Sequence, residues 1–167
     1  MYFAMFQQMK KQLGQLDKWL DLATAAAAAK SFDPNLFLAF RLAPDQFGFA
    51  RQVQTACDTL KLAIARVTGQ TPPANPDTET TIDELQARVR ATIAYVDGFS
   101  EQDLEGAGER TITTPRWEGK HMTGADYLLE HALPNFYFHL THAYALLRHN
   151  GVAIGKRDYL GALTLRA

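Results

Sequence analysis

The sequence has little of what marks a secreted or membrane-bound chain. It contains one cysteine, Cys57, so no internal disulfide can form. The alanine-rich run over 23–29 favours helix but is too weakly apolar to cross a membrane. At the N-terminus, no basic leader precedes an apolar run of signal-peptide length. We therefore expect a cytoplasmic protein in which Cys57 is a small buried core residue rather than a nucleophile.

The sequence also lacks an excess of charge of either sign. Its 17 Lys and Arg residues face 18 Asp and Glu residues, which gives a formal net charge of −1. The basic residues are scattered along the chain, so neither nucleic acid nor a membrane surface is expected as a partner. With 47% hydrophobic and 21% charged residues, the composition is that of one globular domain over 1–167.

What the sequence does have is apolar residues that recur at alternating intervals of three and four, as in amphipathic helices. The first such segment covers about residues 2–30. A second helix is expected to begin near Pro44 or Asp45 and to end at Gly69. A third begins with a capping-box sequence at residues 81–84 and is closed by a glycine at position 98.

A last helix is expected after Gly124, beyond a long polar crossover over 98–123. Within the crossover, residues 111–113 have the character of a short extended segment. Pro134 should kink the last helix, and Gly151 fits the left-handed position just after its end. Four amphipathic helices with a long connection before the last one predict an all-α fold, a four-helix bundle.

Four of the five histidines lie on this last helix. His131, Asn135 and His139 follow one another at intervals of four residues, so they lie on nearly one face. Two histidines at that interval can hold one metal ion, but here the adjacent pair is Asn135 and His139. His131 and His142 are expected to be structural, and His149 fits a cap at the helix end. The aromatic residues around His139 would line an apolar pocket.

Several segments resemble a known family. They are LAPDQF (42–47), ARQVQ (50–54), TGADYLL (123–129), ALPNFYFH (132–139), AYALLRHNG (143–151) and GKRDYLG (155–161). These stretches span nearly the whole chain and are similar to a bacterial family of unknown function within the DinB/YfiT-like superfamily. The resemblance implies an up-down-down-up four-helix bundle, usually dimeric. Its better-understood members bind a divalent metal through one histidine of the second helix and two of the last.

Carried over residue by residue, the resemblance places His139 on the second histidine of the last-helix pair and Asn135 on the first. The second helix has no histidine, and Gln52 or Thr55 is the polar residue near the expected position, with Gln54 a further alternative. The implied set for zinc or nickel is therefore His139, Asn135 and Gln52. Its two neutral amides depart from the usual nitrogen, sulfur and carboxylate ligands of zinc.

Two functions remain open at this point. The first is a binding or stress-related protein that lost the metal and holds a small molecule at the open end of the bundle. The second, which the resemblance implies, is a divalent-metal-dependent transferase or hydrolase acting on a small substrate, with thiols as one candidate class. His139 would then anchor the metal, or act as a general base without one. In either case Arg51, Tyr137 and Tyr144 are expected to contact the small molecule.

The oligomeric state and the tail are further expectations. The resemblance and the aromatic N-terminal residues Tyr2, Phe3 and Phe6 both favour a homodimer. The tail motif over 155–161 is expected either to close over the site or to dock on the partner chain, and the sequence leaves both alternatives open.

Overall fold

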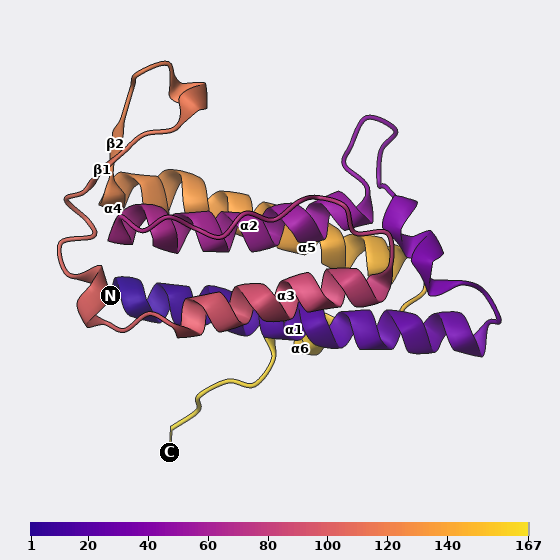
Figure 1. Ribbon diagram of the computed structural model, residues 1–167. Coiled ribbons are helices and arrows are strands. Elements are labelled where there is room, and N and C mark those ends of the chain that lie inside the picture. The colour runs from indigo at the N-terminus through magenta and orange to yellow at the C-terminus, as the bar shows by residue number, and fades with distance from the viewer. Residues whose placement is uncertain (167) are drawn as a thin grey trace.

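The computed structural model describes residues 1–166 and places four long helices side by side (Figure 1). They are α1 (Tyr2–Ala29), α2 (Phe49–Thr68), α3 (Ile82–Asp97) and α5 (Leu133–His149). Figure 1 shows α1 and α5 running in one direction and α2 and α3 in the other. Because α2 and α3 are parallel, residues 69–81 must travel back along the bundle before α3 begins.

The apolar stripes of the four helices meet in one core. Each helix contributes fully buried side chains, among them Leu13, Leu60, Val89 and Leu140. Cys57 is fully buried in this core, and burial raises the pKa of its thiol to about 12. The prediction of a buried core cysteine is therefore confirmed, and its thiol stays protonated at neutral pH.

The structure corrects the predicted start of the second helix. α2 begins at Phe49, whereas Pro44 and Asp45 lie in a turn that follows the 3₁₀ helix η1 (Pro34–Ala39). The backbone amide of Phe49 donates to the carbonyl of Phe40 at 2.9 Å, which closes this loop just before the helix. Proline and aspartate suit a tight turn as well as a first helical turn, so a contact between the two ends of the loop decided the boundary.

The crossover before the last helix folds into a small hairpin. Its elements are η2 (Gln102–Leu104), β1 (Thr111–Ile112), η3 (Pro115–Trp117) and β2 (Met122–Thr123). The strands are antiparallel, with Thr111 opposite Thr123, and the extended segment predicted from the sequence is confirmed. Figure 1 shows this hairpin rising from one end of the bundle, beside the end of α2 and the start of the last helix.

The last helix is divided near the proline. α4 (Gly124–Asp126) leads into a π-helical segment, η4 (Tyr127–Ala132), and α5 follows. Proline at position 134 has no N–H to offer the carbonyl four residues earlier. The backbone amide of Leu133 donates instead to the carbonyl of Leu128, five residues back. The disturbance expected at Pro134 thus takes the form of a π-helical turn, a feature often found at functional sites.

The tail motif docks on its own chain. It forms α6 (Lys156–Leu160), which packs along α1. The indole Nε1 of Trp19 donates to the carbonyl of Asp158 at 3.3 Å, and Trp19 stacks on Tyr159 with ring centroids 5.6 Å apart. The tail is therefore part of the bundle surface and lies away from the hairpin.

The aromatic side chains at the N-terminus pack against the core of their own chain. Phe6 is fully buried, and Tyr2 and Phe3 are half-buried against the core. These side chains no longer favour association, so the homodimer stays a prediction that depends on the resemblance alone. Among residues 1–166, none of the helices has the length and apolar character needed to cross a membrane.

Candidate functional site

His139 and Gln52 meet where α5 crosses the first turn of α2. The side-chain nitrogen of Gln52 donates to the carbonyl of Phe47 at 3.1 Å, so its Oε1 faces His139 as an acceptor. His139 Nδ1 lies 2.8 Å from that oxygen. Since an amide oxygen can only accept, the proton is assigned to Nδ1 and the lone pair to Nε2. The ring of Phe47 stacks on the imidazole at 6.3 Å.

This histidine is held in its neutral form. The residue is only 6% exposed, and burial lowers the pKa of its imidazole to about 4, with smaller effects from the charges of His142 and Arg51. Arg51 lies over the ring of Phe47 and forms an ion pair with Asp77. At neutral pH the group is therefore an uncharged imidazole fixed by an amide and covered by an aromatic ring.

Asn135 lies one helical turn before His139 but bonds elsewhere. Its side-chain nitrogen donates to the hydroxyl of Thr59 at 2.7 Å, and that hydroxyl donates to the carbonyl of Thr55 at 2.7 Å. Both amides of the implied metal set are thus engaged with protein groups. Among residues 1–166, no group of three or more His, Cys, Asp or Glu side chains could hold a metal ion. One imidazole and two neutral amides do not fit a zinc or nickel site.

The structure separates the two predicted tyrosines from His139. Tyr144 packs edge-on against Trp19, with ring centroids 5.5 Å apart, and against Tyr159 of the tail at the same distance. Tyr137 lies close to Gln8 of α1, and burial raises the pKa of its phenol. Both tyrosines therefore face α1 and α6. Of the residues expected to contact a small molecule, Arg51 is the one beside His139.

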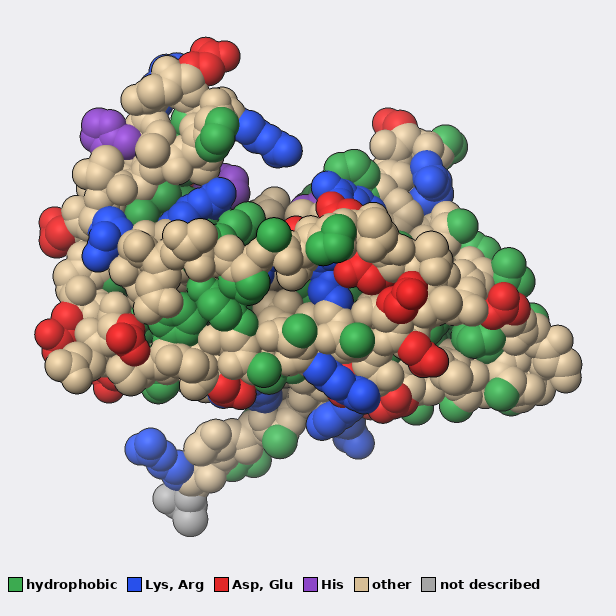
Figure 2. Space-filling view, viewed as in Figure 1, with side chains coloured by type: hydrophobic (Ala, Val, Ile, Leu, Met, Phe, Trp, Pro, Cys, Tyr) green, Lys and Arg blue, Asp and Glu red, His purple; other side chains and the backbone are tan. Residues whose placement is uncertain are grey.

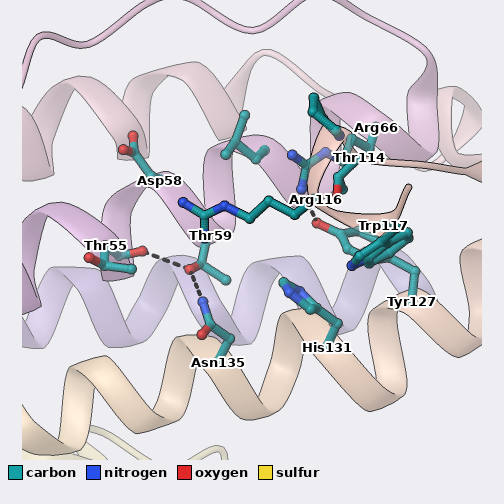
Figure 3. A pocket seen from close by; sticks show the side chains of 12 residues that line it. Thr55, Asp58, Thr59, Arg66, Thr114, Arg116, Trp117, Tyr127, His131 and Asn135 are labelled. Atoms are coloured by element: carbon teal, nitrogen blue, oxygen red, sulfur yellow. Dashed lines mark hydrogen bonds between the residues drawn. The ribbon is translucent and has the colours of Figure 1, made fainter. Parts of the chain in front are cut away.

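A pocket of about 350 Å³ lies beside Asn135 and His131, toward the start of the last helix from His139 (Figure 3). It lies between α2, the η4–α5 segment and the hairpin. Its lining residues are Thr55, Asp58, Thr59, Leu62, Arg66, Thr114, Pro115, Arg116, Trp117, Tyr127, His131 and Asn135. Among the residues proposed from the sequence, Asn135 and the alternative ligand Thr55 line this pocket, while Gln52, Arg51 and His139 do not.

Aromatic rings form one wall of the pocket. Tyr127 and His131 stack with ring centroids 5.4 Å apart, and Trp117 of the hairpin meets them edge-on at 6.1 and 5.9 Å. Arg66 donates to the hydroxyl of Tyr127 at 2.9 Å. Burial and the nearby Arg66 charge both lower the pKa of His131, so the imidazole in this wall is neutral at physiological pH.

Sequence reasoning missed the residues that define this pocket. Arg116 and Trp117 lie in the crossover, which the sequence identified only as unusually long. Arg66 lies in the last turn of α2. A tryptophan next to an arginine in an otherwise polar loop is the signal that was available, because large aromatic side chains are costly to leave exposed.

Asp58 of the pocket lining belongs to an ion cluster built around two buried cations, Lys61 and Arg88. Asp58 lies 2.8 Å from both Lys61 Nζ and Arg88 Nη2. Arg88 also pairs with Asp77 at 3.0 Å and with Glu79 at 2.8 Å, both on the segment that returns from α2 to α3. The cluster therefore fastens residues 69–81 to the bundle and neutralises the carboxylate that faces the pocket.

Comparisons with known proteins agree with this architecture. The sequence profile described as "Domain of unknown function (DUF1993)" matches residues 1–160. The crystal structure of a DinB family member protein from Shewanella denitrificans is similar to this chain, with a TM-score of 0.93 and 49% sequence identity. The match covers 97% of this chain and 92% of that one. A search of curated proteins found no match.

Proposed function

This chain belongs to the DUF1993 family, and we propose that it binds a small organic molecule in the pocket between α2, η4 and the hairpin. The observation that carries the proposal is the pocket itself, which three separate segments build at the hairpin end of the bundle. Its volume of about 350 Å³ is within the range of small-molecule sites. Its mixture of aromatic rings with a few polar groups is also typical of such sites.

The groups around the pocket favour binding over catalysis. His139, the general base suggested by the sequence, lies outside the lining, is largely buried and has an acidic pKa of about 4. An imidazole with that pKa is a weak base at neutral pH. The hydroxyl of Thr59 is held by a backbone carbonyl and by Asn135 rather than by a base. A metal-dependent transferase or hydrolase would need ligands that this donor set does not supply.

The proposal is tested with a fragment collection that contains acidic, basic and neutral compounds in equal numbers. Binding is measured as a rise in the midpoint of thermal unfolding and as a change in tryptophan fluorescence. Trp117 is half-buried in the pocket, whereas Trp19 is buried beneath α6. Trp117→Phe should therefore abolish the fluorescence response of true pocket ligands.

A pocket-filling variant provides the control. Leu62 lines the pocket and is partly exposed, so Leu62→Trp should fill the space while the fold persists. Leu36→Trp places the same side chain on exposed η1, away from the pocket. Ligands should stabilise the wild type and Leu36→Trp but not Leu62→Trp. Equal stabilisation of all three proteins, or no stabilising fragment at all, would show that the pocket is not a binding site.

A further inference from the structure

The charges that line the pocket are unbalanced. Arg66 and Arg116 both line it, and neither forms an ion pair with any residue over 1–166. The one carboxylate in the lining belongs to Asp58, and Lys61 and Arg88 already neutralise it. The pocket thus carries two guanidinium groups without a matching anion, next to a neutral imidazole.

The two arginines approach from opposite elements. Figure 3 shows the side chain of Arg116 extending from the hairpin across the pocket above Thr59, with Arg66 beside the ring of Tyr127. Arg66 donates one bond to the Tyr127 hydroxyl, which leaves its remaining N–H groups for another acceptor. In the space-filling view of Figure 2, basic side chains border the notch between the hairpin and the bundle. A planar fork of N–H donors matches the two oxygens of a carboxylate.

Resting on the proposed function, we infer that the ligand is a small aromatic carboxylate. Its ring would lie against Trp117, next to the stacked pair of Tyr127 and His131, and its carboxylate would lie between Arg116 and Arg66. A site of about 350 Å³ holds a molecule of one or two rings together with a short acidic side chain. The two guanidinium groups would favour an anionic ligand, and the aromatic wall would favour a ligand with a ring.

A matched set of probes measures the contributions of the negative charge and of the aromatic ring to affinity separately. Indole-3-acetate, its neutral amide and the cation tryptamine share one ring system, whereas acetate has the anion without the ring. Dissociation constants are measured by titration calorimetry at pH 7 and low salt. Indole-3-acetate should bind most tightly, with the amide and tryptamine roughly ten-fold weaker or more, since one charge-assisted pair contributes about that factor.

Single substitutions then locate the contact. Arg116 is exposed, so Arg116→Gln should fold normally and weaken indole-3-acetate roughly ten-fold, with little effect on the amide. Arg116→Lys should recover part of the affinity, because it keeps the charge without the fork. Arg157→Gln removes the same charge from exposed α6 and should leave binding unchanged.

The possible results test two claims separately: that the ligand is an aromatic carboxylate, and that the pocket binds small molecules at all. If the amide and tryptamine bind as tightly as the acid, and Arg116→Gln has no effect, the class is wrong while the pocket still binds small molecules. Binding of neutral or basic fragments alone, with no response to any acidic probe, leads to the same conclusion. If neither the probes nor the fragment collection bind, the inference and the proposed function both fail.

Discussion

Gln52 Oε1 and His139 Nδ1 lie 2.8 Å apart although 87 residues separate them in the sequence. In the superfamily that the sequence resembles, the last-helix position of His139 belongs to a metal ligand, and the second helix supplies a histidine near Gln52. Here an amide orients the imidazole directly. A hydrogen bond within the chain thus joins α2 and α5 at two positions that the resemblance assigns to metal ligands.

Restoring the missing imidazoles should therefore create a metal site. The double variant Gln52→His/Asn135→His would bring three histidines to the face between α2 and α5, a ligand set that suits zinc or nickel. We expect near-stoichiometric metal in this variant after dialysis against either ion, and none above background in the wild type. Mass spectrometry of metal content makes the measurement.

Two controls accompany that experiment. Adding His139→Ala to the double variant should remove the metal, because two histidines alone bind weakly. Circular dichroism checks that the variants keep their helices. A folded double variant that holds no metal would mean that positions 52 and 135 do not correspond to the superfamily ligands.

Stability should depend on pH through His139. Its pKa is about 4 in the folded protein against a usual value of 6.5, so the unfolded chain takes up a proton that the folded protein resists. The contribution to stability is complete above pH 6.5 and is lost as the pH falls from 6.5 toward 4. The loss should approach about 3 kcal/mol. His131, whose pKa is also lowered, adds to it in the same direction.

Urea unfolding at pH 7 and pH 4.5 measures this dependence. The non-titrating variant His139→Gln is the comparison, because it keeps a polar side chain at the same position. The wild type should lose more of its unfolding free energy between the two pH values than the variant does. Equal losses would show that His139 is not the group responsible.

Removing Arg88, the buried cation at the centre of the ion cluster, should destabilise the protein. Arg88 is 5% exposed and faces three carboxylates, so Arg88→Met leaves Asp58, Asp77 and Glu79 with too little positive charge. We expect the free energy of unfolding to fall by about 1 to 3 kcal/mol, because the carboxylates left behind are partly exposed and Asp58 and Asp77 keep another cation. Arg90, two residues further on, pairs with Asp17 on the surface, and Arg90→Met should cost about 0 to 1 kcal/mol. Similar losses in both variants would contradict the assignment.

Two glycines should respond in opposite directions to alanine. A Cβ at Gly124 would lie 1.8 Å from the carbonyl oxygen of Ala107, a backbone atom that cannot rotate away. Gly124→Ala should therefore destabilise the protein by at least about 2 kcal/mol. Gly14 lies within α1 with nothing within 4 Å of its added Cβ, so Gly14→Ala should stabilise by about 0.5 to 1 kcal/mol. Thermal and urea unfolding of the two variants measure whether the free energy of unfolding falls for Gly124→Ala and rises for Gly14→Ala.

Local chemistry in the sequence was enough to predict most helix boundaries. The capping box of Thr81 and Glu84 is present, and the glycines at 69 and 151 adopt the positive φ angles of +74° and +88° that helix ends favour. These features depend on neighbours within a few residues, so the sequence contains all the groups involved. The start of α2 at Phe49 differed because its amide bonds to Phe40, across a loop.

The sequence by itself determined the four-helix pattern, the buried cysteine and the candidate pair of Asn135 and His139. Only the tertiary structure showed which of Gln52, Gln54 and Thr55 lies beside His139. Gln52 faces His139, Gln54 bonds to Glu79 on the returning segment, and Thr55 lines the pocket. Successive helical positions point about 100° apart. Neighbours one or two residues apart therefore serve different surfaces, and which surface each meets depends on how distant segments pack.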